Sequence, residues 1–168
     1  MVILALITLP DQRPDKLSEV SFQTTESAEL YFKNVRAFYY LTREEAEGIL
    51  YVYRLKSIFE DSLPTLPFAL YNNWRTNETF IRLDTGYLDL KSVEALILDS
   101  ASTKSDTLFF PDPSNESQYI FARDVFRAIK EKERLGLMSR NEVAWITESQ
   151  TSSIKRTLSD YFKLLDKI

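Results

Sequence analysis

The residue types best suited to binding gather in one polar stretch, Asn72-Asn73-Trp74-Arg75. A tryptophan beside an arginine and two amides offers an apolar plate with hydrogen-bond donors, and Trp and Arg are enriched at binding hot spots. We therefore interpret Asn73, Trp74 and Arg75 as a candidate binding surface for a sugar, a peptide strand or another small ligand. The alternative is a hairpin loop whose Trp74 folds back onto a sheet, because most tryptophans are largely buried.

A second candidate is Asp84-Thr85-Gly86, which follows the apolar run Phe80–Leu83. It resembles the Asp-Thr-Gly signature of aspartic proteases. The resemblance implies a carboxylate-based hydrolase in which Asp84 and its symmetry mate in a homodimer share one proton, as in retroviral-type proteases. Leu135-Gly136 is similar to the family's second element, whereas Tyr87 stands where the family has a small residue. The alternative is a turn that ends a strand, since Asp and Gly are turn formers.

Several other chemistries are excluded by composition. The 168 residues include no cysteine and no histidine, so thiol nucleophiles, disulfides, thiolate or imidazole zinc sites and Ser–His–Asp triads cannot form. Only three glycines occur, whereas a loop that cradles phosphate needs several close together. We expect no cofactor and no metal site. The leading hypothesis is a non-enzymatic binding or assembly module for a protein or small ligand, with the Asp84 hydrolase as the alternative.

The charge distribution argues against nucleic acid as a partner. The net charge is −4; residues 1–116 carry 11 Lys and Arg against 18 Asp and Glu, and residues 117–168 carry 10 against 7. A nucleic-acid binder would show a stronger basic footprint. Arg36 and Arg54 lie among aromatic residues and, if buried, are candidate anion ligands. A solvated helix face accounts best for the basic stripe of Arg123, Arg127, Lys130 and Arg134.

The N-terminus leaves two interpretations open. Met1–Leu9 is apolar except for Thr8 but is far shorter than the roughly 20 residues that span a bilayer. It is either a buried strand or the end of a membrane anchor, and residues 10–16, with two prolines and four charges, are typical of a linker. We divide the chain into this segment, 1–16, and one α+β domain, 17–168. The compartment (cytoplasmic, membrane-tethered or exported) and the oligomeric state stay open.

Strands are predicted through the middle of the chain, because aromatic and β-branched residues dominate there. Their ranges are Val20–Gln23, Leu30–Tyr40, Ile49–Leu55, Phe68–Tyr71, Thr79–Leu83, Leu108–Phe110 and Val143–Ile146. Phe68–Tyr71 and Thr79–Leu83, which flank the Asn-rich connection 72–78, are predicted to form a hairpin. Thr42–Glu45 could instead open a helix as a capping box, although Gly48 favours a turn and a strand. Leu90–Leu98 fits either a strand or a short helix.

Two amphipathic helices are predicted near the C-terminus. The first covers Phe121–Arg134, with Gly136 as its stop, and a capping box at Thr147–Gln150 opens the second. The second has an apolar stripe of Ile154, Leu158, Tyr161, Leu165 and Ile168, while Lys155, Arg156, Ser159, Asp160 and Lys163 are assigned to the solvent side. Because such helices must bury their apolar stripes, we predict an α+β fold: a mostly antiparallel sheet with both helices packed on one face, a two-layer sandwich.

Overall fold

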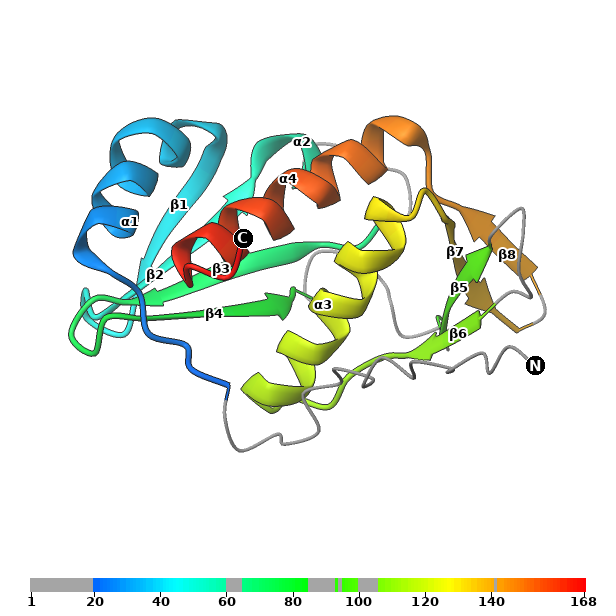
Figure 1. Ribbon diagram of the computed structural model, residues 1–168, viewed down its shortest axis with the longest axis horizontal. Helices are drawn as coiled ribbons and strands as arrows, with labels where there is room; N and C mark the ends of the chain where they lie inside the picture. Colours follow the sequence, from blue (N-terminus) through cyan, green and yellow to red (C-terminus); the bar gives the residue numbers. More distant parts are fainter. Residues whose placement is uncertain (1–19, 60–64, 85–92, 94, 100–105, 141) are drawn as a thin grey trace, which may run out of the picture.

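The computed structural model describes residues 20–59, 65–84, 93, 95–99, 106–140 and 142–168. Within these ranges the strands form two antiparallel sheets of four strands each, in the orders β1-β2-β3-β4 and β6-β5-β7-β8. Helices cover the first sheet, and the second sheet lies at the other end of the molecule (Figure 1). The predicted α+β class and the antiparallel pairing are confirmed, and the predicted strands are divided between two sheets.

The first sheet contains three strands that the sequence predicted and, ahead of them, one that it did not predict. Its members are β1 (Tyr40–Glu45), β2 (Leu50–Leu55), β3 (Phe68–Asn73) and β4 (Glu78–Leu83). The hairpin of β3 and β4 is confirmed, with Asn73 opposite Glu78 at its closed end. The helix considered for Thr42–Glu45 is wrong, because this stretch pairs with β2 as strand β1. The turn that follows uses three residues at positive φ, among them Gly48 at 83°.

The strand predicted for Leu30–Tyr40 is also wrong. The chain is helical there: α1 (Glu26–Tyr31) runs into a π-helical turn η2 (Phe32–Arg36) and a 3-10 turn η3 (Ala37–Tyr39). Thr25 caps α1 by accepting a hydrogen bond from the Ala28 backbone N–H at 3.2 Å. Phe32 is buried against the rings of Tyr40 and Tyr53. Tertiary packing of Phe32 thus outweighs the strand preference of its aromatic neighbours.

The second sheet consists of β5 (Ala95–Asp99), β6 (Asp106–Phe109), β7 (Arg134–Ser139) and β8 (Glu142–Trp145). Strand β7 was not predicted, and the interpretation of Gly136 as a helix stop is wrong. Gly136 lies inside β7 opposite Trp145. A Cβ atom there would come within 2.5 Å of Val143 Cγ1 and 3.0 Å of the Trp145 ring. Glycine is therefore required by the close approach of β8.

Both predicted C-terminal helices are present, as α3 (Asn115–Lys130) and α4 (Glu148–Leu164), along with the short α2 (Lys56–Phe59). Helix α3 packs on β4 and α4, and α4 packs on β3, so both helices lie on one face of the first sheet (Figure 1). The capping box at Thr147 and Gln150 is confirmed. One buried cluster joins the helices to both sheets and includes Leu70, Leu96, Val125, Leu137 and Leu158.

Predictions for the N-terminus and for part of the middle lie outside the described residues. This holds for Met1–Leu9, for the linker at 10–16, and for residues 90–92 and 94 of the ambiguous stretch before β5. Val20–Gln23 is extended at its end, where Gln23 pairs with Glu78 as an isolated bridge. From Ala95 onward the ambiguous stretch is a strand.

Candidate anion-binding site

Helix α4 supplies one wall of a strongly charged hollow. Two rows of side chains, each spaced by four residues, line it: Ser152, Arg156 and Asp160 in one row, and Lys155, Ser159 and Lys163 in the other. Residues four apart lie on one helix face about 6 Å apart along the axis. The rows therefore present four charged groups and two hydroxyls side by side. The capping box at the start of α4 fixes where these rows begin.

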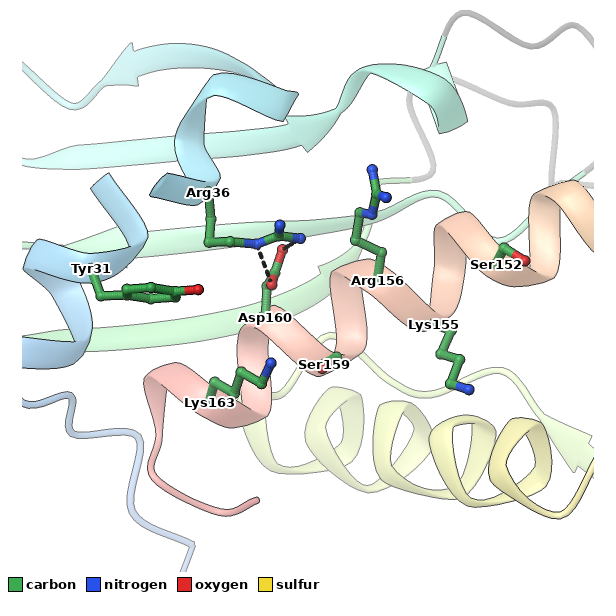
Figure 2. Close-up of a pocket in the computed structure, with 8 residues that line it drawn as sticks. All are labelled: Tyr31, Arg36, Ser152, Lys155, Arg156, Ser159, Asp160 and Lys163. Atoms are coloured by element: carbon green, nitrogen blue, oxygen red, sulfur yellow. Dashed lines mark hydrogen bonds and ion pairs between the residues drawn. The ribbon is translucent and has the colours of Figure 1, made fainter. Parts of the chain in front are cut away.

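The facing wall comes from the N-terminal helical segment, through Tyr31 and Arg36. Burial of Phe32 anchors this segment to the sheet and leaves Tyr31 and Arg36 on the side turned toward α4 (Figure 2). The hollow between the two walls has a volume of about 320 Å³, which is within the range that small ligands occupy. Residues 31 and 36 thus meet residues more than a hundred positions later in the chain.

Asp160 is the residue that ties the two walls together. Its carboxylate accepts hydrogen bonds from Arg36 Nε at 2.8 Å and from a terminal Arg36 nitrogen at 2.9 Å, a bidentate pair drawn in Figure 2. Tyr40 donates its hydroxyl to the same carboxylate at 2.8 Å. Asp160 is 4% exposed, so three charge-assisted hydrogen bonds satisfy a nearly buried charge.

These contacts shift the acid–base behaviour of the two partners of Asp160. The hydrogen bonds from Arg36 to Asp160 raise the pKa of the Arg36 guanidinium, which stays charged. Burial raises the pKa of Tyr40 well above its usual value of 10.0, and the negative charge of Asp160 raises it further. At neutral pH the Arg36 guanidinium is therefore charged and the Tyr40 phenol is protonated.

The remaining cations of the hollow have no acidic partner. Among the described residues, Lys155, Arg156 and Lys163 form no ion pair within 4.0 Å. Arg156 lies over the Tyr39 ring at 5.1 Å from the centroid, a contact that orients the guanidinium without neutralising it. Four cations and one carboxylate thus face a single hollow, and the carboxylate is engaged by Arg36. Such a surface is suited to hold an anion such as phosphate or carboxylate.

A second hollow of about 430 Å³ continues from the first along α4 and shares Ser152 and Lys155 with it. Its other walls come from the end of α3 and the start of β7, with Lys132, Arg134 and Glu133. Here Glu148 and Glu133 offset the cations. The excess of positive charge therefore belongs to the first hollow.

The predicted binding residues lie elsewhere, at the closed end of the β3–β4 hairpin. Trp74 is 45% exposed, and its indole N–H donates to the Gly48 carbonyl at 2.6 Å. Asn73 Oδ1 accepts from the Arg75 backbone N–H at 3.1 Å, and the Arg75 guanidinium lies 5.7 Å from the Trp74 ring centroid. The structure thus brings Asn73, Trp74 and Arg75 together, but the indole N–H is used to join two turns of the sheet.

Asp84 lies at the end of β4, where its carboxylate accepts a hydrogen bond from Arg54 Nε at 2.5 Å. Both side chains are largely buried, at 12% and 11% exposed. Arg54, a candidate anion ligand if buried, is thus buried and bound to this carboxylate. Thr85 and Gly86 lie outside the described residues, so the Asp-Thr-Gly turn itself has no structural account. Asp84 does not line the α4 hollow.

The sequence pointed to one residue of the hollow, Arg36, and missed the rest. Asp160 had been assigned to the solvent side of α4, and this assignment is wrong. The position of Asp160 on the helix wheel, beside the buried Thr157 and Leu164, was the available signal. A carboxylate at the edge of a buried arc requires a partner, because an unpaired buried charge is costly.

In the described part of the chain, no group of three or more acidic side chains is placed to hold a metal ion. In that same part, no helix is both long and apolar enough to cross a membrane. The fold and the hollow define an α+β protein with a basic, partly aromatic pocket. Comparisons with protein-family models, with curated proteins and with solved structures found no match.

Proposed function

We propose that this protein is a non-enzymatic binding module whose α4 hollow takes an anionic group, phosphate or carboxylate, carried by a protein or small ligand. The observation that carries the proposal is the unmatched charge of Lys155, Arg156 and Lys163 beside a carboxylate already bound to Arg36. Positive groups held close together repel one another unless a counter-charge binds between them. An anion in the hollow relieves that repulsion.

The arrangement around Asp160 supports binding in preference to proton-transfer chemistry. Arg36 and Tyr40 hold the carboxylate on the inner side of the hollow. The hydroxyls of Ser152 and Ser159 line the hollow and can donate hydrogen bonds to an anion.

The alternative hydrolase stays a prediction about Asp84 in a homodimer. Its pairing with Arg54 does not favour that prediction, since an aspartic dyad needs a second carboxylate with which to share a proton. The exposed Trp74 surface stays a candidate contact for a second ligand group. Its indole N–H is already bonded to Gly48.

The test is a titration of the full chain with inorganic pyrophosphate, followed by amide chemical shifts, against a sodium chloride titration at equal ionic strength. We expect saturable shifts at residues 31–36 and 152–163. The double variant K155A/K163A should weaken binding about a hundredfold, since each of the two charge-assisted contacts contributes roughly 1.5 kcal/mol.

The matched control removes the same amount of charge elsewhere. R43A/R75A deletes two exposed cations from the hairpin end of the first sheet and should leave the pyrophosphate affinity unchanged. Equal weakening by both double variants would show that binding follows net charge alone. Shifts that never saturate, or that centre on Trp74, would contradict the assignment of the α4 hollow.

A further inference from the structure

An exposed apolar ridge adjoins the hollow on the N-terminal helical segment. We define it by five residues of α1, η2 and η3: Leu30, Tyr31, Val35, Phe38 and Tyr39. All five are more than 40% exposed, and Phe38, at 78%, is the most exposed large hydrophobic residue in the described chain. Exposed apolar residues that cluster in this way mark an interaction site, whereas scattered ones need no explanation.

Cations surround this ridge. The Lys56 ammonium donates to the Phe38 carbonyl at 2.9 Å and lies 5.1 Å from the centroid of its ring. Arg36 and Arg156 both lie over the Tyr39 ring. Tyr31 belongs to the ridge and to the hollow at once, so the ridge continues into the wall of the hollow that faces α4.

The charge around the ridge decides between possible occupants. Lys56, Lys155, Arg156 and Lys163 form no ion pair with described residues, while Lys33 and Arg36 are neutralised by Glu29 and Asp160. A second copy of the chain on the same face would place these four cations opposite four identical ones, which is repulsive. The occupant is therefore anionic. The occupant also has to contact the aliphatic side chains of Leu30 and Val35. Nucleotide bases bind proteins largely by stacking on aromatic rings, which these two side chains lack, so a nucleic acid is disfavoured.

The exposed position of the ridge favours a flat partner over an inserted segment. Its residues come from α1, η2 and η3 in turn, and α1 lies at one end of the molecule (Figure 1). A partner helix needs a groove to receive it, whereas exposed apolar residues with basic flanks match the surface of a bilayer that contains anionic lipid.

We infer that the apolar ridge docks on an anionic membrane surface, with Phe38 and Tyr39 among the headgroups and the α4 hollow holding the phosphate of a lipid headgroup. This inference rests on the anion-binding function proposed above and names the source of the anion. It needs no membrane-spanning helix. It is also separate from the membrane attachment that Met1–Leu9 suggests by sequence, because it uses only residues of the described fold.

The experiment is flotation of the full chain with vesicles of phosphatidylcholine that contain about 30% phosphatidylserine, compared with vesicles of phosphatidylcholine alone. We expect binding to the anionic vesicles to be at least about tenfold stronger. F38S/Y39S should weaken binding about tenfold, and K155A/K163A to a similar extent, since the apolar and ionic contributions act together.

Two control variants make the result specific. F109S removes a phenylalanine of nearly equal exposure, 76%, from strand β6 of the second sheet, and should leave vesicle binding unchanged. L4D tests the apolar N-terminal segment. In the L4D background, vesicle binding should still be weakened by F38S/Y39S. Equal losses from F109S and F38S/Y39S, or binding abolished by L4D alone, would overturn the inference.

The same samples separate this inference from the proposed function. If pyrophosphate binds the hollow and vesicles do not bind, only the membrane inference fails. If pyrophosphate does not bind, the proposed function fails together with the membrane inference. A further arm uses polyglutamate: binding that depends on Phe38 in the absence of vesicle binding would assign the ridge to an acidic protein partner and overturn the membrane assignment.

Discussion

The two ends of strand β1 carry two different kinds of polar site. Near Tyr40 the chain reaches the α4 hollow, where Arg36 and Asp160, 124 positions apart in the sequence, form a bidentate pair. Near Glu45 it reaches the hairpin end, where Asn73, Trp74 and Arg75 contact one another and the neighbouring turn. The first site joins distant elements, whereas the second is made by a short stretch of chain. A local motif is visible in a sequence, and a site between distant elements is not.

The two sites also differ in charge. The hollow collects four cations around one engaged carboxylate, whereas the turns at the hairpin end carry Glu44, Glu45, Glu47 and Glu78 with only Arg43 and Arg75. The chain as a whole has a net charge of −4. Four of its 21 Lys and Arg residues nevertheless face the one hollow, and this contrast is what the following changes test.

Asp160→Asn should have the largest effect on stability. The amide keeps one acceptor oxygen but puts an NH2 group in place of the other, so the partly buried Arg36 guanidinium loses its counter-charge and one of its hydrogen bonds, and we expect a loss of about 3 kcal/mol in the free energy of unfolding. Urea denaturation measures it. Glu45→Gln, which breaks an exposed pair with Arg43 at the hairpin end, should change stability by about 0.5 kcal/mol or less. Equal losses would remove the energetic distinction between the two sites.

Tyr40→Phe should show its effect most clearly at alkaline pH. Burial raises the pKa of Tyr40 above 10.0 in the folded state, so its contribution is complete below that pH and is lost as the pH rises toward the folded value. The variant should lose about 1 kcal/mol at neutral pH through the missing hydrogen bond. Its stability should then fall less steeply than that of the wild type above pH 10. An unchanged slope would contradict the burial of the Tyr40 hydroxyl; Tyr39→Phe, at an exposed position, is the control.

Trp74→Phe tests the hairpin end. The change removes the hydrogen bond to Gly48 and keeps an aromatic ring, so we expect a loss of about 1 kcal/mol, measured by thermal or urea unfolding. The pyrophosphate affinity should not change. Weaker pyrophosphate binding in this variant would place the anion at the hairpin and reverse the comparison.

Glu29→Gln should have the smallest effect. Although burial favours its protonated form, hydrogen bonds from Thr24 and Asn72 lower the pKa of Glu29 below 4.5. The stabilisation from the carboxylate is therefore present above pH 4.5 and is lost as the pH falls through the folded value. The variant should show a flatter decline of stability in acid. A decline identical to that of the wild type would show that Glu29 makes no net contribution.

Much of the fold was predictable from local patterns. Alternation identified β2, β3 and β4, and the capping box at Thr147 identified the start of α4. The failures occurred where packing outweighed local preference. The stretch around the buried Phe32 is helical although its aromatic residues favour a strand. Gly136 lies where β8 approaches β7 closely, and not at the end of a helix. In both cases the deciding contact comes from another element: from Tyr40 and Tyr53 for Phe32, and from Val143 and Trp145 of the neighbouring strand for Gly136.

The sequence by itself determined the α+β class, the amphipathic character of the last helix and the absence of thiol and imidazole chemistry, because these follow from residue type and spacing. Only the tertiary structure decided that Asp160 turns inward to meet Arg36 and Tyr40, and that Lys155, Arg156 and Lys163 share a hollow. The physical reason is that a charged side chain is buried only where partners neutralise it, and the partners of Asp160 come from the opposite end of the described chain.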